Sequence, residues 1–342
     1  VERQFNNCER KLGLGLAELE NAARESKEFG EKCQEIMDML DQFDKMLSQK
    51  LAVSADKDIL QQQVQDFEPL YHEIMGQEHE VIMLINRGRD VISRAPKGDQ
   101  KNLQKNLDTI DKQWQKIKKT AQDRQKRLNT SMEHCKKYVT QQGVFVPWLD
   151  KAEQQLERMQ PISFVKAELQ KQEKELQSFR NDVNRHGSDY DGTHSGGSTF
   201  VASCDVDKEI VTEELAILKE RWDHLNMAIA ERAAAISDVM AKLGMFNDDA
   251  RDLDNNMSRL EGKLKDLEKK PQDAKTLDAI KGMLDDTKDM DKLFGKLENE
   301  GEDLINDADH LGSDASNIKD TLDGLGDRLN GLRGSLEDKA DS

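Results

Sequence analysis

The chain has 342 residues, of which 35% are charged, 36% hydrophobic and 5% aromatic, and its net charge at pH 7 is −17. This charge argues against a general affinity for nucleic-acid phosphates or anionic membrane surfaces, and no apolar run approaches the ~20 residues that span a bilayer. The four cysteines show no CxxC or Cys/His metal spacing, which argues against a disulfide framework and indicates a reducing compartment.

An apolar ladder with alternating three- and four-residue steps occurs three times at a nearly constant interval. Heptad spacing of this kind is typical of long helices packed on other helices. Its repetition predicts a tandem array of helical bundles. The three copies are Leu103, Leu107, Ile110, Trp114, Ile117, Ala121 and Leu128; Val211, Leu215, Leu218, Trp222, Leu225, Ile229 and Ile236; and Ile318, Leu322, Leu325, Leu329, Leu332 and Leu336.

The start of the chain carries the same spacing. Phe5, Leu12 and Leu19 lie on the ladder, and Phe5 precedes Trp114 by almost the same interval that separates Trp114 from Trp222. We therefore expect residues 1–19 to be the end of the last helix of a preceding repeat, with Phe5 in the core of that repeat.

A second seam predicts the first helix of each repeat. In the first repeat it runs from Phe29 through Leu40 to Leu47, and it recurs in the second repeat from Tyr138 through Leu149 to Leu156. Together the two seams predict three repeats, at residues 20–128, 129–236 and 237–342.

The middle helix of the first repeat is expected from Asp56 to Arg94. Pro69 lies inside it and should kink it or open one turn, because proline removes a backbone hydrogen bond and clashes with the preceding turn. In the third repeat the middle helix is expected to start after Pro271 and to end at Leu311.

The middle helix of the second repeat is expected to start after Pro161 and to end near His186. The segment that follows, residues 187–204, is rich in glycine and serine. This composition is typical of flexible surface loops, so we expect a flexible loop insert there.

The junctions between repeats lack helix-breaking residues. Residues 117–136 and 225–243 contain neither glycine nor proline, which predicts that the third helix of one repeat continues into the first helix of the next. Gly143 and Pro147 are expected to break or bend that helix in the second repeat.

The third repeat differs from the other two in composition. From Ser237 to Ser342 there are 27 Asp and Glu against 16 Lys and Arg, a net charge of −11, and the segment holds ten of the 21 glycines and no tryptophan. Each helix-interior glycine costs up to ~1 kcal/mol relative to alanine. We expect this repeat to unfold first under force or heat.

The motifs within the seams resemble those of a known family. Gln113-Trp114-Gln115-Lys116-Ile117 and Arg221-Trp222-Asp223-His224-Leu225 in the third helices, with Trp148-Leu149 in a first helix, resemble spectrin repeats, the three-helix units of the spectrin, dystrophin and plakin families. The run from Glu28-Phe29 to Met39-Leu40 is most similar to the rods of spectraplakins, which link actin and microtubules. Leu329 replaces the third-helix tryptophan in the last repeat, and Met39 and Met257 replace the first-helix tryptophan.

The resemblance implies an all-α fold of tandem three-helix left-handed coiled-coil bundles joined by continuous linker helices. A bundle of ~30-residue helices is roughly 45 Å long, so three in line approach roughly 140–150 Å. Aromatic and apolar side chains at heptad positions are expected to fill the cores; the residues proposed for this structural core are Phe5, Phe29, Leu40, Trp114, Trp148, Trp222, Met257 and Leu329.

No catalytic chemistry is indicated. The GxxxxGK[ST], GxGxxG, GxSxG and HExxH motifs do not occur, and Asp189-Tyr190-Asp191-Gly192 lacks the glutamate of a calcium loop. His72 and His79 are interpreted as surface histidines, since a metal site needs more ligands. We expect no enzyme activity, no cofactor and no bound metal.

The expected function is structural. The chain is interpreted as a cytoplasmic, cytoskeleton-associated rod segment of a larger linker protein, acting as a spacer and tension-bearing element. Its partners are expected to be cytoskeletal or adhesion proteins, bound mostly through regions outside this chain, with no nucleic acid and no membrane insertion. A monomeric rod is expected, with a dimer as the alternative. A second functional hypothesis is a docking platform that uses a repeat surface or the 187–204 loop.

Overall fold

The computed structural model describes residues 1–270 and 273–341, and this part of the chain is almost entirely helical. It contains no extended strand; a single isolated bridge joins Ser54 and Val206. The prediction of an all-α fold is confirmed. In chain order the helices are α1 (Glu2–Ser48), α2 (Lys57–Gly76), α3 (Glu78–Arg94), α4 (Lys97–Glu157), α5 (Lys166–Arg185), α6 (Gly187–Ser203), α7 (Glu209–Leu267), α8 (Ala274–His310) and α9 (Ser316–Asp341).

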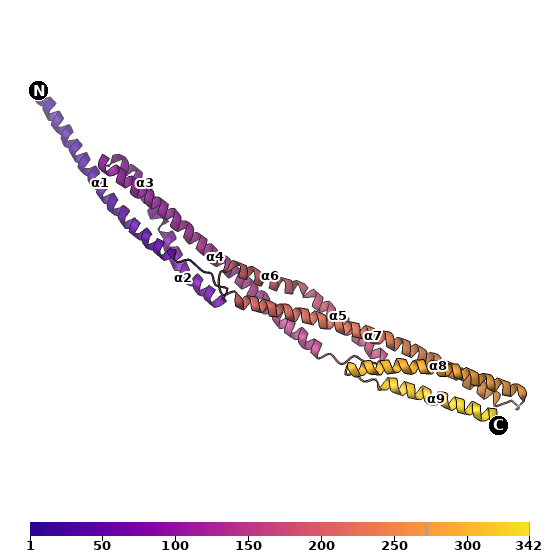
Figure 1. Cartoon of the computed structure of the whole chain (residues 1–342). Helices are drawn as coiled ribbons and strands as arrows, with labels where there is room; N and C mark the ends of the chain where they lie inside the picture. The colour runs from indigo at the N-terminus through magenta and orange to yellow at the C-terminus, as the bar shows by residue number, and fades with distance from the viewer. Residues whose placement is uncertain (271–272, 342) are drawn as a thin grey trace. The chain divides into compact units, whose positions relative to one another are not determined.

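Two very long helices, α4 and α7, run without interruption through the predicted junctions (Figure 1). The expectation of continuous linker helices is therefore confirmed. The expected break at Gly143 and Pro147 is wrong, because α4 includes both residues. Inside a helix, the ring of a proline such as Pro147 clashes with the backbone carbonyl of the residue four positions earlier. Here that residue is Gly143, which has more backbone freedom than any other residue type to adjust.

The middle helix of the first repeat is divided into α2 and α3 at Gln77, not at Pro69. Pro69 lies within α2 without ending it. The second repeat has the same division, between α5 and α6 at His186, although no proline is nearby. Gln77 and His186 are separated by the repeat interval, so the interruption belongs to the repeat and not to the proline. In the third repeat α8 is unbroken, and Pro271 lies outside the described residues.

The expectation of a flexible loop at residues 187–204 is wrong. Residues Gly187–Ser203 form helix α6, which buries Thr193, Gly197 and Phe200. Glycine-rich sequence disfavours a helix in isolation. In this chain the missing side chains allow α6 to approach its neighbours closely, as the contacts below show.

The chain divides into two compact units, Val1–Phe145 with Asp191–Lys219, and Val146–Tyr190 with Glu220–Ser342. In the first unit, a continuous apolar core is formed by α1, α2, α3 and α4 together with Phe200 on α6 and the start of α7. In the second unit, α8 and α9 lie side by side and pack against the end of α7 (Figure 1). This division does not coincide with the boundaries 128/129 and 236/237, which remain predictions.

The residues proposed for the structural core occupy three kinds of environment. Buried positions hold Phe29, Leu40, Trp114, Met257 and Leu329, with exposed fractions of 4%, 0%, 1%, 0% and 2%. Trp148 and Trp222 are only partly buried.

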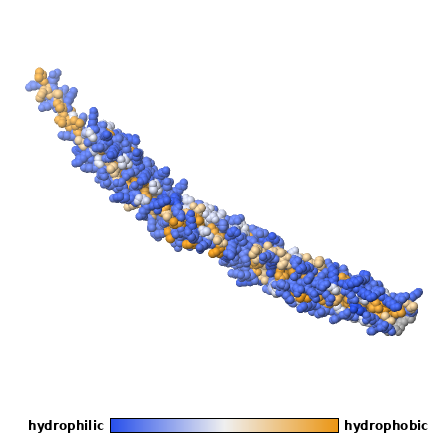
Figure 2. Space-filling model, viewed as in Figure 1, coloured by the Kyte–Doolittle hydropathy of each residue, from blue (hydrophilic) through white to orange (hydrophobic). Residues whose placement is uncertain are grey.

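Phe5 does not lie in a core. The Phe5 side chain is 66% exposed, and Leu12 and Leu19 on the same helix are exposed to a similar degree. The reason is that no other described helix runs beside this end of α1 (Figure 1). Apolar side chains are visible on the surface there, in contrast to the mainly hydrophilic surface over the bundles (Figure 2). That residues 1–19 complete a preceding repeat stays a prediction.

Candidate functional site

A glycine on the middle helix makes a very close helix-to-helix approach in each bundle. At Gly88 on α3, an added Cβ atom would lie 2.5 Å from a methyl carbon of Leu107 on α4 and 2.7 Å from the ring of Phe29 on α1. Real Cβ atoms do not approach other atoms so closely, so any larger residue at this position would force Leu107 or Phe29 to shift. We call this arrangement of glycine, aromatic ring and leucine the glycine notch.

The notch is repeated twice along the chain. At Gly197 on α6 the corresponding distances are 2.7 Å to Leu215 and 2.8 Å to Tyr138, and at Gly301 on α8 they are 2.6 Å to Leu322 and 3.3 Å to Phe246. All three leucines belong to the ladder, and all three aromatic residues lie on the first helix of a repeat. The chain therefore uses the same close contact of three helices in every bundle.

A second repeated feature is a polar clamp between the first and third helices. In the second repeat, Arg221 on α7 hydrogen-bonds Asp150 at 2.5 Å and Glu153 at 2.6 Å, both on α4. The hydrogen bond to Glu153 is the main reason why the pKa of Arg221 is raised above its ordinary value. The doubly paired guanidinium fixes the register of the two helices more specifically than a single charge pair.

The clamp recurs in the third repeat and is weaker in the first. Arg328 on α9 hydrogen-bonds Glu261 at 2.8 Å and also Asp254 on α7, and this contact with Arg328 lowers the pKa of Glu261. The equivalent position in the first repeat is Gln113, which hydrogen-bonds Asp41 at 2.7 Å. In the first repeat the neutral amide of Gln113 therefore replaces the arginine guanidinium.

Arg124 and Arg232 occupy the same position of the ladder in the first and second repeats, and each stabilises the C-terminal end of the first helix of its repeat. Arg124 donates to the backbone carbonyls of Leu47 at 3.1 Å and Gln49 at 2.7 Å, and Arg232 donates to the carbonyl of Gln160 at 2.5 Å. Cations near a helix C-terminus satisfy carbonyls that have no partner within the helix. Burial lowers the pKa of both arginines.

The tryptophans of the second repeat stack with other rings. Trp148 lies against His186, with ring centroids 3.9 Å apart, and Trp222 lies against Tyr190 at 5.1 Å. The two tryptophan centroids are 6.3 Å apart. These ring contacts join α4, the end of α5, α6 and α7.

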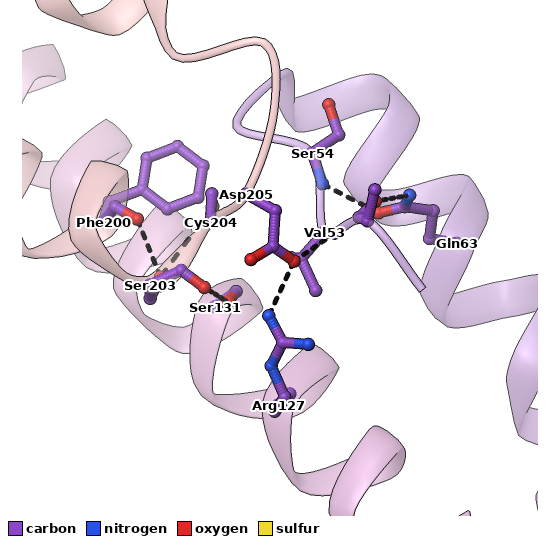
Figure 3. A network of polar contacts seen from close by, with 10 residues as sticks. Val53, Ser54, Gln63, Arg127, Ser131, Phe200, Ser203, Cys204 and Asp205 are labelled. Atoms are coloured by element: carbon purple, nitrogen blue, oxygen red, sulfur yellow. Dashed lines mark hydrogen bonds and ion pairs between the residues drawn. The ribbon is translucent and has the colours of Figure 1, made fainter. Parts of the chain in front are cut away.

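Two loops that are distant in the sequence meet at the first junction (Figure 3). The loop 49–56, which joins α1 to α2, lies against the loop 204–208, which joins α6 to α7. Backbone hydrogen bonds run from Asp205 N to Val53 O at 2.7 Å and from Ala55 N to Val206 O at 2.9 Å. We call this contact the loop latch.

Side chains reinforce the loop latch. The Asp205 carboxylate accepts hydrogen bonds from Val53 N at 2.9 Å and from Arg127 on α4 at 2.6 Å. The bond from Val53 is the main reason, with Arg127 contributing less, that the pKa of Asp205 is lowered. Ser54 donates to Asp207 at 2.5 Å. Val53 and Ser54 are fully buried, whereas the side chains of Asp205 and Arg127 are 42% and 47% exposed.

The second junction is joined less extensively. In the part of the chain that the structure describes, one hydrogen bond connects the loop 158–165 to the start of α9, from Asn317 Nδ2 to Phe164 O at 2.9 Å. Arg127 directly precedes the ladder residue Leu128, and the equivalent position before Ile236 is Ala235. The turn after α8 carries Gly312 and Ser313 where the first junction has Asp205. The charged pair of the first junction is absent from the sequence here.

Comparison with known proteins assigns the family. A model of the spectrin repeat matches residues 24–130 and 133–238. The chain belongs to the spectrin-repeat family. The two matched spectrin repeats overlap the first two repeats expected from the ladder, whose exact boundaries stay predictions. The fold predicted from the resemblance is thereby confirmed.

Individual relatives point to cytoskeletal linkers. The chain is 24% identical over 193 residues to microtubule-actin cross-linking factor 1, isoforms 6/7, of Mus musculus, and equally to isoforms 1/2/3/4/5 of the Homo sapiens protein. These matches cover 56% of the chain but only 6% and 3% of those relatives. Erythrocytic spectrin alpha chain 1 of Mus musculus is 31% identical over 90 residues, which is 26% of the chain and 4% of the relative. The resemblance to spectraplakin rods is confirmed.

Neither a metal-binding group nor a membrane-spanning helix is found in the part of the chain that the structure describes. Residues 1–270 and 273–341 hold no group of three His, Cys, Asp or Glu side chains placed to bind a metal ion. None of the helices in the same ranges has the length and apolarity needed to cross a membrane. The features repeated along the chain are contacts between helices, and these are its candidate functional elements.

The ladder and the Arg124 and Arg232 positions are readable from the sequence, whereas the glycine notch was missed. One signal was present: Gly88 and Gly197 are separated by the same interval as Phe29 and Tyr138. The loop-like composition of residues 187–204 conceals it.

Proposed function

We propose that this chain is a structural rod segment of a larger cytoskeletal linker protein, acting as a spacer and tension-bearing element between filaments or adhesion sites. The main support is the continuity of α4 and α7 through both junctions. A continuous helix transmits load from one bundle to the next without a flexible linker. The glycine notches and the arginine clamps oppose sliding of the helices within each bundle.

The relatives support the cellular setting of this proposal. Microtubule-actin cross-linking factor 1 carries in its name the two filament types that it links, and spectrin alpha chain is a second cytoskeletal protein. By analogy we propose a cytoplasmic, cytoskeleton-associated location, and partners of the cytoskeletal or adhesion class that bind the parent protein largely outside this chain.

The alternative function, docking of a partner through a flexible 187–204 loop, loses its basis. Phe200 in that segment is 1% exposed, and Gly197 packs against Leu215.

Small-angle X-ray scattering combined with sedimentation equilibrium tests the spacer function. We expect a monomer with a radius of gyration of about 40 Å, the value for three bundles in line, since a compact protein of this length has about 20 Å. A particle near the compact value would contradict a spacer, and a stable side-by-side dimer would move the proposal to a two-stranded rod.

A further inference from the structure

We propose that a line of four lysines on the outward side of α4 binds an acidic polypeptide through its carboxylate side chains. The lysines are Lys105, Lys112, Lys119 and Lys126, and we call them the basic stripe. This inference goes beyond the proposed function, because it gives the first repeat a binding surface of its own whether or not the chain bears tension.

The basic stripe is straight because it follows the heptad of the ladder. Each stripe lysine stands two positions after a seam position of α4, which places it on the side of the helix that faces away from the rest of the bundle. All four lysines are exposed, while Trp114 and Ile117 between them are buried. Four residues at seven-residue intervals span about 30 Å along a helix, with successive positive charges about 10 Å apart.

The stripe lysines have no carboxylate within ion-pair distance in the part of the chain that the structure describes. Lysines of α4 that face neighbouring helices are paired: Lys116 lies 2.8 Å from Asp44 on α1, and Lys118 contacts Glu78 on α3. Salt bridges within the bundle therefore do not account for the stripe, and its charges can pair with a partner from outside.

The other two repeats carry carboxylates where the basic stripe begins. The exposed counterparts of its first two lysines are Glu213 and Glu220 in the second repeat and Asp320 and Asp327 in the third. Residues 101–140 hold 11 Lys and Arg against four Asp and Glu, a net charge of +7, whereas the equivalent residues 209–248 have a net charge of −4. A solvated outer face requires charge of either sign. The stripe is therefore a property of the first repeat and not a requirement of the fold.

The chemistry around the basic stripe favours carboxylates over phosphates. Proteins that bind single-stranded nucleic acid combine basic residues with aromatic rings that stack on the bases, and the stripe holds only lysine. Asp108 and Asp123 are exposed within one turn of it and would repel a continuous phosphate backbone or a planar anionic membrane. A helix with Glu or Asp at every seventh residue places its carboxylates opposite the lysines and not opposite these aspartates.

Fluorescence anisotropy of a labelled acidic peptide, titrated with the full chain at low ionic strength, tests the proposal. The peptide has about 28 residues, which is four heptads, with two glutamates in each. We expect one peptide bound per chain, and weaker binding as salt rises, because exposed charge pairs are screened. The combined variant Lys105→Gln, Lys112→Gln, Lys119→Gln and Lys126→Gln should weaken binding about tenfold or more, since it removes four charge pairs.

A second variant with the same change in net charge is the control. It replaces four exposed lysines outside the first repeat by glutamine and should bind the peptide as the unmodified chain does; the substitutions are Lys171→Gln, Lys174→Gln, Lys263→Gln and Lys265→Gln. Glutamine is a good helix former, so circular dichroism should show both variants folded. Equal loss of binding in the two variants, or no binding by the unmodified chain, would overturn the proposal.

Other occupants of the basic stripe are distinguished by parallel measurements on the unmodified chain. A single-stranded oligonucleotide of similar length and vesicles that contain phosphatidylserine should each bind more weakly than the peptide. Sedimentation equilibrium at the same ionic strength should show a monomer. Tighter binding of either phosphate probe, or a dimer that is lost in the stripe variant, would overturn the proposal, because the stripe would then serve a phosphate ligand or a second copy of this chain.

Discussion

Replacing Trp114 by alanine should lower the free energy of unfolding of the first repeat by about 3–5 kcal/mol. The indole is 1% exposed and lies on α4 between Ile110 and Ile117, which are both fully buried. Removal of so large a side chain leaves a cavity that the fixed spacing of three long helices closes only in part. The loss is most of the stability of a small domain. Circular dichroism in a urea titration should show the first repeat unfolding at a much lower urea concentration.

Trp222→Ala is the matched comparison, since Trp222 occupies the same ladder position in the second repeat. It is only partly buried and shares its contacts with Trp148 and Tyr190. We therefore expect a smaller loss than at Trp114. An unchanged midpoint for Trp114→Ala would refute its place in the core, and a larger effect at Trp222 would refute the ranking by burial.

The second large effect is expected from a single methyl group in the glycine notch. Gly197→Ala should destabilise the second repeat by about 1–3 kcal/mol. The new Cβ would stand 2.7 Å from Leu215 and 2.8 Å from Tyr138. The Tyr138 hydroxyl is held by a hydrogen bond of 2.9 Å to Glu214, so the ring has little freedom to move aside. Burial, with a smaller contribution from Glu214, raises the pKa of Tyr138.

Gly262→Ala is the control for the same substitution at an open position. Gly262 lies inside α7, is exposed, and would place its Cβ with no neighbour within 4 Å. Alanine there should stabilise the helix by about 0.5–1 kcal/mol through propensity alone. Urea midpoints should thus move in opposite directions for the two variants. Stabilisation by both would show that α6 packs less closely than the structure has it.

The ladder was readable from the sequence because heptad periodicity reports which side of a helix is buried. Trp114, Met257 and Leu329 are buried where the seams place them. Continuous α4 and α7 followed from the absence of glycine and proline at the junctions. Periodicity and local composition are properties of a short stretch of chain, and these features depend on them alone.

Helix α6 was not predictable in this way. Glycine and serine weaken a helix by intrinsic propensity. Gly197 is favourable inside α6 only because Tyr138 and Leu215 lie so close to its backbone. The loop latch was likewise hidden, because Val53 and Asp205 are far apart in the sequence and no periodicity links them. Phe5 shows that a regular heptad position does not by itself predict burial. Phe5 is exposed because burial also requires a neighbouring helix.

The order in which the repeats yield follows from the distribution of glycine. Gly324 and Gly331 in α9 would each place a Cβ with no neighbour within 4 Å, so no close packing offsets their cost. The third repeat also lacks the latch contacts of the first junction. In contrast, Gly88 and Gly197 make the close contacts of the glycine notch, where an added Cβ would force neighbouring side chains to shift. We therefore expect the weakest element of the array to be the third repeat.

Single-molecule pulling on the chain from its two ends tests the central claim, a tension-bearing array that yields in a set order. The first unfolding event should release about 300 Å, the extended length of one repeat less its folded length, and Gly324→Ala with Gly331→Ala should raise the force of that event alone. The first and second repeats should then unfold at higher force. Extension without discrete events, or a first event whose force is unchanged by the two alanines, would contradict this claim.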